Sequence, residues 1–354
     1  MSINVALPGD LGRLAEISRA YLFSGPTPLQ PMPNLTRACG SSGNLFVKRD
    51  DCTELAFGGN KVRQLEFYLG EAMAQDADTI LITGAVQSNF VRLAAAAARK
   101  LGMDCHIQLE ERVAKNDPLY RTSGNVLLDR LLGATMHSYP EGEDEAGADR
   151  QLGVIADGLR REGKSPYIIP LGPGHAPLGA LGYVVAAAEL LEQITEQKRH
   201  IDEIVLGSGS GATHAGMLFG LRALGSLIRV TGICVRRDAE QQFDRIQSRC
   251  QEIADLLDVE ACVSNDDIVL IDDFLAPGYG KAGEDCLQAI VLAAQTESLM
   301  LDPTYTGKVM AGFIRGVKET ADDDQRGMVF LHTGGTPAIF AYENDLDMAL
   351  SPLP

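Results

Sequence analysis

Residues 79–100 read TILITGAVQSNFVRLAAAAARK. Their first five residues form an apolar, β-branched run that is typical of a buried strand, and the alanine-rich part that ends near Lys100 is typical of a helix. A loop that contains glycine, serine and asparagine separates the two. This stretch therefore predicts a strand, a loop and a helix, which is the repeating unit of a parallel α/β sheet.

The same order recurs along the chain. Small polar loops follow three of the predicted strands, at residues 83–89, 207–213 and 333–336. Because ligands of open α/β sheets bind beyond the carboxyl ends of the strands, we expect these three loops to converge on one crevice. With 354 residues, the chain is long enough for two lobes. Further strands are predicted at residues 44–48, 104–109, 166–171, 202–206, 228–235 and 328–332.

Composition and charge argue against several classes of protein. The formal net charge of −17 disfavours a nucleic-acid partner and binding to an anionic membrane. Seven scattered cysteines, an odd number with no CxxC pair, indicate reduced thiols and a cytoplasmic protein. We expect no signal peptide, no membrane span and no metal site, because the patterns typical of each are missing from the sequence. The acidic stretch 141–149 predicts a solvated loop or helix start rather than a site.

Three side chains suit amine and proton chemistry. The segment FGGNKVRQLE, residues 57–66, places Lys61 after two glycines and an asparagine, at the start of a predicted helix. Glycines bring such a lysine close to a flat ligand, which suits an imine with a carbonyl cofactor; the simpler alternative is a turn with a solvated lysine. Tyr279 and Tyr305 lie in glycine-containing loops, where a phenol can transfer or orient a proton.

Two of the polar loops suit an anionic ligand. Residues 207–213, GSGSGAT, expose backbone N–H groups at a predicted helix start, which favours phosphate, although the lysine of a Walker loop is missing. The alternative is a tight turn that binds nothing. Gln87, Ser88 and Asn89 suit either a helix cap or a ligand site in which Asn89 donates to a hydroxyl group and Ser88 holds a carboxylate.

Together these motifs resemble the tryptophan-synthase-β-like (fold type II) pyridoxal-phosphate enzymes, and more closely the D-cysteine desulfhydrase and 1-aminocyclopropane-1-carboxylate deaminase family. The resemblance covers nearly the whole chain in family order. It implies two open, twisted, mostly parallel α/β lobes with the cofactor in the cleft: a large lobe of residues 1–59 plus 168–354, and a small lobe of residues 60–167. It also implies a homodimer. The motifs that carry it are Pro26–Leu29, Val47–Asp51, Gly58–Lys61, Gly84–Asn89, Leu178–Tyr183, Gly207–Gly216, Asp302–Lys308 and His332–Gly335.

The resemblance also implies roles for individual residues. Lys61 would carry pyridoxal 5'-phosphate as an imine and then move the α-proton of a small amino-acid substrate. Ser88, Tyr279 and Tyr305 would be catalytic with it. The remaining cofactor contacts would come from Asn89, Gly209, Ser210, Gly211, Ala212, Thr213, Thr306 and Thr333, and the substrate contacts from Gln87, Ser88, Asn89 and Tyr279.

One position separates the branches of this family. The deaminases have glutamate directly after the second tyrosine, against the pyridine nitrogen, and this chain has Thr306. A threonine leaves the pyridine largely unprotonated and weakens the electron sink, which elimination tolerates and cyclopropane opening does not. Thr306 therefore favours a carbon–sulfur lyase that acts on D-cysteine or L-cysteate over the 1-aminocyclopropane-1-carboxylate deaminase. A binding protein that kept the fold without catalysis is a third alternative.

The segment 171–178 departs from the family pattern and leaves the substrate open. Arg121 and His175 are two further candidates for contact with the tail of the substrate. A sulfonate substrate would need extra donors, which residues 112–122 and 172–178 could supply.

Overall fold

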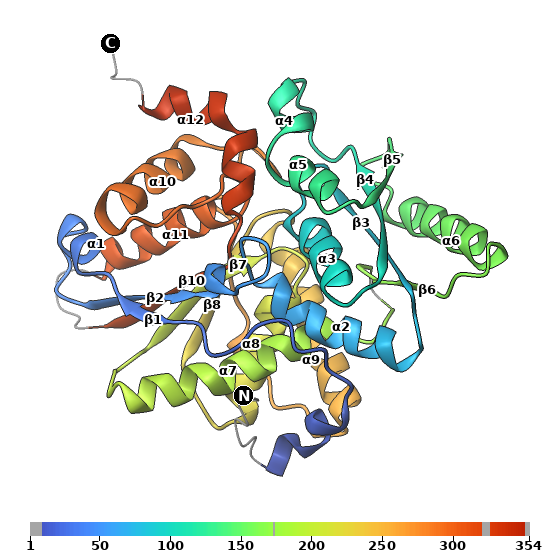
Figure 1. Cartoon of the computed structure of the whole chain (residues 1–354). Helices are drawn as coiled ribbons and strands as arrows, with labels where there is room; N and C mark the ends of the chain where they lie inside the picture. Colours follow the sequence, from blue (N-terminus) through green and yellow to red (C-terminus); the bar gives the residue numbers. More distant parts are fainter. Residues whose placement is uncertain (1–8, 173, 321–325, 351–354) are drawn as a thin grey trace.

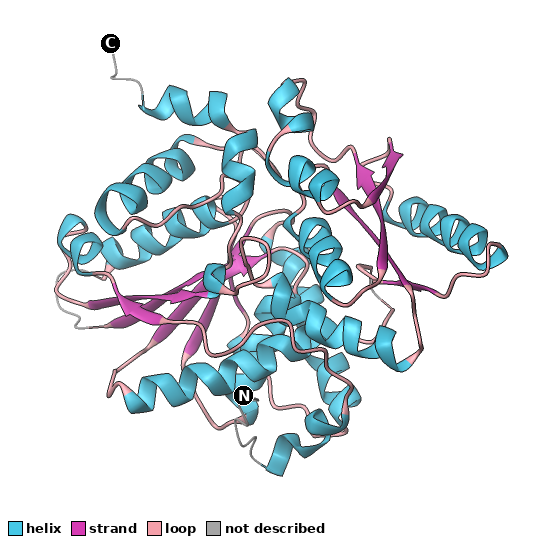
Figure 2. Cartoon of the chain, in the orientation of Figure 1, coloured by secondary structure: helices cyan, strands magenta, loops and turns pink. Residues whose placement is uncertain are grey.

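The computed structural model describes residues 9–172, 174–320 and 326–350. Two sheets of different size lie side by side, each covered by helices on both faces (Figures 1 and 2). The chain is thus a mixed α/β protein with mostly parallel sheets, as the alternation of strands and helices predicts.

The larger sheet has six strands. In spatial order they are β1 (Leu29–Pro31), β2 (Asn44–Arg49), β10 (Gly327–His332), β7 (Glu203–Ser208), β8 (Arg229–Cys234) and β9 (Val269–Ile271). Strand β1 is antiparallel to β2, and the other pairs are parallel. One face carries α1 (Pro33–Ala38), α10 (Glu284–Glu297) and α11 (Thr306–Glu319), and the other carries α7 (Leu178–Glu196), α8 (Ala212–Ala223) and α9 (Ala239–Leu257) (Figure 1).

The smaller sheet has four parallel strands. Their order is β5 (Thr135–Tyr139), β4 (Asp104–Glu110), β3 (Thr79–Ala85) and β6 (Pro166–Ile168). Helices α3 (Asn89–Lys100) and α5 (Gly124–Leu131) lie on one face, and α6 (Glu145–Arg161) lies on the other (Figure 1). The remaining elements are α2 (Lys61–Ala74), α4 (Pro118–Thr122), α12 (Glu343–Leu350) and four short 3-10 helices, η1 (Gly9–Glu16), η2 (Asp50–Cys52), η3 (Asn265–Asp267) and η4 (Thr336–Ala341).

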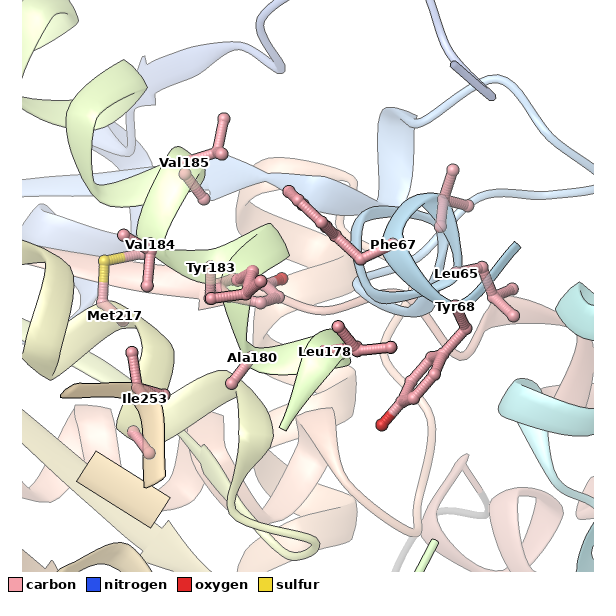
Figure 3. Packing of buried hydrophobic residues seen from close by; sticks show 14 of the residues in the cluster. Leu65, Phe67, Tyr68, Leu178, Ala180, Tyr183, Val184, Val185, Met217 and Ile253 are labelled. Carbon is pink, nitrogen blue, oxygen red and sulfur yellow. The ribbon is translucent and has the colours of Figure 1, made fainter. Parts of the chain in front are cut away.

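A buried contact between α2 and α7 joins the two halves. Figure 3 shows Phe67 and Tyr68 of α2 together with Leu178 and Tyr183 of α7 in one buried cluster. The backbones come so close that a Cβ at Gly182 would lie 2.2 Å from the carbonyl oxygen of Arg63. Only glycine fits at that position, so the small residues of α7 bring α2 against the large sheet.

Helix α7 bears on the expectation that the chain has no membrane span. Among the described residues it alone is long and apolar enough to cross a bilayer by length and composition, with a mean hydropathy of 1.2 over its most apolar window. However, 72% of this window is buried inside the protein. Its apolar side chains therefore belong to the core of the large sheet.

The predicted strands are all present, with shifted ends. The strand predicted at residues 166–171 ends at Ile168, and the short strands β1, β5 and β9 were not predicted. All strands of the small sheet lie within residues 79–168, and those of the large sheet lie outside that range, which agrees with two lobes. The lobe boundaries at residues 59/60 and 167/168 stay a prediction.

Candidate active site

The three polar loops that follow β3, β7 and β10 meet at one cavity of about 70 Å³, here called the inner cavity. The expected convergence is therefore confirmed. Its lining comes from both sheets and from the start of α2, and comprises Asn60, Lys61, Ser88, Asn89, Phe90, Gly207, Gly209, Ser210, Gly211, Thr213, Asp302, Tyr305, Thr333 and Gly334.

A second cavity of about 120 Å³, the outer cavity, adjoins the first. The two share the lining residues Lys61, Ser88, Phe90, Gly209, Ser210 and Tyr305. The outer cavity adds Tyr279 and a set of charged side chains: Glu110, Arg112, Glu145, Asp149, Arg236, Arg237 and Arg245.

Lys61 is the first residue of α2 and lines both cavities. Its Nζ lies 3.3 Å from Oε1 of Gln64 and 5.1 Å from the ring centroid of Phe90, and no carboxylate of the described residues pairs with it. Burial lowers the pKa of Lys61 to about 8. A substantial fraction of its amine is therefore neutral near physiological pH, as a nucleophile that adds to a carbonyl group requires.

A buried ion network fixes the helix that carries Lys61. Arg63 donates through Nε and Nη2 to Asp50 at 3.1 and 3.0 Å, and through Nη1 and Nη2 to Glu189 at 2.9 and 2.8 Å. All three side chains are buried. Because Asp50 follows β2 and Glu189 lies on α7, this network ties the first turn of α2 to the large sheet.

The loop after β7 has the geometry of an anion site. Gly211 adopts a φ of +94° and precedes α8, whose N-terminal N–H groups and positive dipole end lie at the inner cavity. The Thr213 hydroxyl accepts hydrogen bonds from Nδ2 of Asn60 at 2.9 Å and Nε2 of Gln64 at 3.0 Å. With its acceptor sites filled, the hydroxyl keeps its own proton for a phosphate oxygen.

Ser88 and Asn89 act as helix residues and as cavity residues at once. The Ser88 Oγ caps α3 by accepting from the N–H of Val91 at 3.3 Å. Oδ1 of Asn89 accepts from Nδ2 of Asn125 at 2.9 Å, which fixes the orientation of the Asn89 amide. Nδ2 of Asn89 has no partner among the described residues and is available to donate to a ligand.

The two predicted tyrosines are in contact. Their hydroxyl groups form a hydrogen bond, and the ring centroids of Tyr279 and Tyr305 are 5.9 Å apart. Burial raises the pKa of Tyr305, with the neighbouring Tyr279 adding to this effect, so the phenol stays protonated. Nζ of Lys308 donates to the carbonyl groups of Leu275 and Gly278 at 2.7 and 2.8 Å, which holds the Tyr279 loop against α11.

Thr306 points to Asp302 and does not line either cavity. Its hydroxyl lies 2.7 Å from Oδ1 of Asp302, and this carboxylate also accepts from the backbone N–H groups of Thr304, Tyr305 and Thr306 at 2.9–3.0 Å. Asp302, Tyr305 and Thr333 line the inner cavity, whereas Thr306 does not.

Gln87 and Ala212 also lie outside both linings. The Gln87 side chain donates to the carbonyl groups of Tyr120 at 2.7 Å and Ser123 at 3.0 Å, and it accepts from the N–H of Asn125 at 2.9 Å. These bonds use its side chain to hold the α4–α5 segment, so the expected substrate contact would have to come from its backbone.

The sequence did not reveal most of the charged residues of the outer cavity. Glu145 and Asp149 belong to the stretch expected to be a solvated loop or helix start. Helix α6 does begin there and Asp149 is exposed, which confirms that expectation, whereas the place of both side chains in the cavity lining was not expected. Of the two candidates for the substrate tail, Arg121 pairs with Glu111 at 2.6 Å outside the cavities, and His175 is exposed. No cluster of His, Cys, Asp and Glu suited to a metal ion occurs among the described residues.

The inner cavity fits pyridoxal phosphate. It offers a buried amine for the carbonyl group, a glycine loop at a helix N-terminus for the phosphate, and an amide donor for the ring hydroxyl. In open α/β proteins such loops are the usual phosphate sites.

Comparison with known proteins agrees with this geometry. The chain is 40% identical over 337 residues to a D-cysteine desulfhydrase of Klebsiella pneumoniae, covering 95% of this chain and 100% of that protein. It is also 40% identical over 332 residues to a D-cysteine desulfhydrase of Salmonella choleraesuis, covering 94% and 98%. The crystal structure of a homologue of 1-aminocyclopropane-1-carboxylate (ACC) deaminase superposes with a TM-score of 0.84 at 36% identity, covering 97% and 99%.

A fungal L-serine ammonia-lyase from Rhizomucor miehei shares the fold, with a TM-score of 0.62 at 18% identity over 92% of this chain and 98% of that one. The family described as "Pyridoxal-phosphate dependent enzyme" matches residues 21–334. The match spans every loop that lines the inner cavity. The chain belongs to this family of pyridoxal-phosphate-dependent enzymes.

Proposed function

We propose that the chain is a carbon–sulfur lyase that eliminates the β-substituent of a β-sulfur-substituted alanine, such as D-cysteine or L-cysteate, and releases pyruvate and ammonia. The observation that carries the proposal is the meeting of Lys61, Ser88 and the Tyr279–Tyr305 pair at one continuous space beside the phosphate loop. The relatives named D-cysteine desulfhydrase support the same class of reaction.

The bound cofactor supplies an electron sink that acidifies Cα of the substrate. Lys61 Nζ takes the Cα proton, because its lowered pKa lets the amine act as a base near neutral pH. Ser88 and the backbone N–H groups of its loop hold the substrate carboxylate. Asn89 holds the ring hydroxyl of the cofactor, and Gly209–Thr213 holds its phosphate.

The Tyr279–Tyr305 pair lies on the side of the outer cavity, and we assign it to the β-substituent. A protonated phenol can donate to the departing sulfur group as negative charge develops there. The raised pKa of Tyr305, caused first by burial, keeps that proton in place.

The surroundings of Asp302 favour elimination over cyclopropane opening. Two hydrogen bonds reach each carboxylate oxygen, so its four acceptor positions are filled. No lone pair of Asp302 would then remain to hold a proton on the pyridine nitrogen, and we assign the hydroxyl of Thr333, which lines the inner cavity, to that atom. A weak electron sink suffices when a leaving group takes the electrons.

The test is product analysis with purified enzyme. D-cysteine, L-cysteine and L-cysteate are incubated in parallel, and pyruvate, sulfide and sulfite are measured in each. We expect pyruvate together with one sulfur product, and no turnover by Lys61→Ala. Equal turnover by Lys61→Ala, or 2-oxobutanoate from the cyclopropane substrate with no sulfur release, contradicts the proposal.

We further propose a cytoplasmic homodimer. All seven cysteines are free thiols, which suits a reducing compartment. Light scattering of the purified protein tests the dimer, and cell fractionation tests the location.

A further inference from the structure

Four arginines, Arg112, Arg236, Arg237 and Arg245, line the outer cavity. We propose that Arg236 and Arg237, supported by Arg112 and Arg245, select a substrate whose β-substituent is itself an oxyanion, a sulfonate in place of a thiol, and that Glu145 occupies this anion site until the substrate displaces it. This inference rests on the proposed elimination and names its substrate class.

Four arginines and three carboxylates line the outer cavity, so the positive side chains outnumber the negative ones. Arg112 is neutralised by a bidentate pair with Glu110, at 2.8 and 2.9 Å. Glu145 alone serves two guanidinium groups, those of Arg236 at 2.7 Å and Arg237 at 3.1 Å. Among the described residues, the one other carboxylate that pairs with either of them is Glu143, which is exposed and 3.4 Å from Arg236.

Arg245 and Asp149 are the last two charged groups of this lining. Arg245 donates through Nε to the carbonyl group of Ser210 at 2.8 Å, and no carboxylate of the described residues pairs with it. Asp149 pairs with none of these arginines in the described part of the chain, and burial, the largest cause, raises its pKa. Burial, followed by the charges of neighbouring arginines, lowers the pKa of Arg237, and it lowers that of Arg245 to about 10. An added anion would relieve this repulsion.

The position of the cluster suits the substrate and not the cofactor. None of the four arginines lines the inner cavity, where the loop after β7 offers its N–H groups to a phosphate. The guanidinium of Arg236 lies 5.9 Å from the ring centroid of Tyr279, the tyrosine assigned to the β-substituent. A substrate with Cα at Lys61 and its β-substituent at Tyr279 therefore reaches the arginines.

Glu145 behaves as an internal occupant of this site. It is the first residue of α6, in the small-sheet half, whereas Arg236 and Arg237 lie in the loop that begins after the last residue of β8, Cys234, in the large sheet. Both guanidinium groups contact the same oxygen of its carboxylate, Oε1, whereas a sulfonate offers three oxygens. Planar guanidinium groups bind such oxygens in pairs, whereas a thiol has none to offer.

The proposed elimination places additional negative charge next to the arginines. Loss of the Cα proton and cleavage of the Cβ–S bond leave both bond electrons on sulfur, so the sulfonate departs as sulfite with one more negative charge. Water then converts the remaining aminoacrylate to pyruvate and ammonium, and the sum is cysteate plus water to pyruvate, ammonium and bisulfite. Guanidinium groups at the sulfonate therefore stabilise the transition state more than the bound substrate.

The experiment uses the holoenzyme and compares both enantiomers of cysteate with β-chloroalanine, whose leaving group carries no oxyanion before elimination. We expect Arg237→Gln to lower kcat/KM for cysteate by about 10- to 100-fold, and to lower it far less for β-chloroalanine. Arg160→Gln, an exposed arginine of α6 paired with Asp157, is the matched control and should change neither. The visible absorbance of the bound cofactor shows that each variant is folded and loaded.

A second variant moves in the opposite direction. Glu145→Gln removes the competing carboxylate, so KM for cysteate should fall several-fold while KM for β-chloroalanine changes little. Cysteate should also raise the midpoint of thermal unfolding of the wild-type holoenzyme and not that of Arg237→Gln, a binding result that does not depend on turnover.

The outcomes separate the two proposals. Elimination from β-chloroalanine or cysteine but not from cysteate overturns this inference and leaves the lyase standing. Absence of elimination from all substrates overturns the lyase, and the thermal shift then decides the anion site. Equal losses on both substrates, or loss of cofactor absorbance in Arg237→Gln, overturns the inference, because the arginine would then serve the fold or the cofactor phosphate.

Discussion

At the scale of single residues, the site works through groups whose protonation is set by burial. The two tyrosine hydroxyls share a hydrogen bond, and burial keeps Tyr305 protonated, while the burial of Lys61 favours its neutral amine. The same cavity thus holds a base and an acid at one pH, which proton removal at Cα and proton donation at the leaving group both require.

Replacing Tyr305 by phenylalanine tests this arrangement. The variant loses the acid and keeps the ring, so we expect kcat for pyruvate formation to fall by about 100-fold or more, with a smaller change in KM. Tyr120→Phe is the control, because Tyr120 is a buried tyrosine that packs against Tyr342 outside both cavities. A Tyr305→Phe enzyme that keeps its kcat removes the acid role from this residue.

Sequence could identify residues within continuous motifs, and it missed those that the fold assembles. Lys61, Ser88 and Asn89 each lie in a short motif next to a glycine or a helix cap. Arg112 lies in the segment 112–122 that was expected to offer donors, but Arg236 and Arg237 come from a segment more than 110 positions further along the chain, and no spacing links the two. The sequence could not predict that the Thr306 side chain points away from both cavities, because its orientation depends on the hydrogen bond to the carboxylate of Asp302, four residues earlier.

At the scale of elements, α2 is held by charge as well as by apolar packing. Arg63 is fully buried and bonds two carboxylates, Asp50 and Glu189. Arg63→Met leaves both acids without this partner, so we expect the free energy of unfolding to fall by about 3–5 kcal/mol. Urea unfolding measures the change, and the exposed Arg160→Met, with an expected loss below about 1 kcal/mol, is its control. Similar losses in both variants would mean that the buried network adds nothing beyond a surface pair.

Helix α5 carries a buried carboxylate that opposes folding. Both side-chain oxygens of Asp129 lack a hydrogen-bond partner among the described residues, and burial raises its pKa to about 7 in spite of the charge of Arg92. The native state therefore binds this proton more tightly than the unfolded chain, whose aspartate has a pKa near 3.8. Stability is lost as the pH rises from about 4 to 7.

Asp129→Asn should remove that loss. We expect the variant to be more stable than wild type by about 2–4 kcal/mol at pH 8, with the difference vanishing below about pH 4. Denaturant unfolding of both proteins across this range gives the answer. If the stability difference between the variant and wild type did not change with pH, Asp129 would have the same pKa in the folded and the unfolded protein.

Strands could be predicted from the sequence where they are buried in the core of a sheet. Strand β3 is buried along its whole length and appears in the sequence as an apolar run. Strand β5 has no buried residue, and β1 and β9 have only three residues each at the edges of the large sheet. Such strands depend on a neighbour for their hydrogen bonds, so they leave little pattern in the sequence.

At the scale of the whole molecule, the inner cavity lies between the two sheets and is lined by residues from both. Ser88 and Asn89 follow β3 of the small sheet, whereas Gly209, Ser210 and Thr333 follow strands of the large one. A bound cofactor would therefore contact both halves. These contacts would come in addition to the packing of α2 against α7, which the polypeptide forms by itself.

Removal of the cofactor should consequently weaken the molecule as a whole. If the free cofactor is present at about 100 times its dissociation constant, mass action predicts that the holoenzyme gains about 2.7 kcal/mol over the apoprotein. Differential scanning calorimetry with added inorganic phosphate separates the contributions: phosphate occupies the loop after β7 alone, so it should restore only part of the lost stability. An anion that contacts one loop cannot connect two sheets. Full restoration of stability by phosphate would therefore show that the cofactor stabilises the large sheet alone, and it would contradict the prediction that the cofactor connects the two halves.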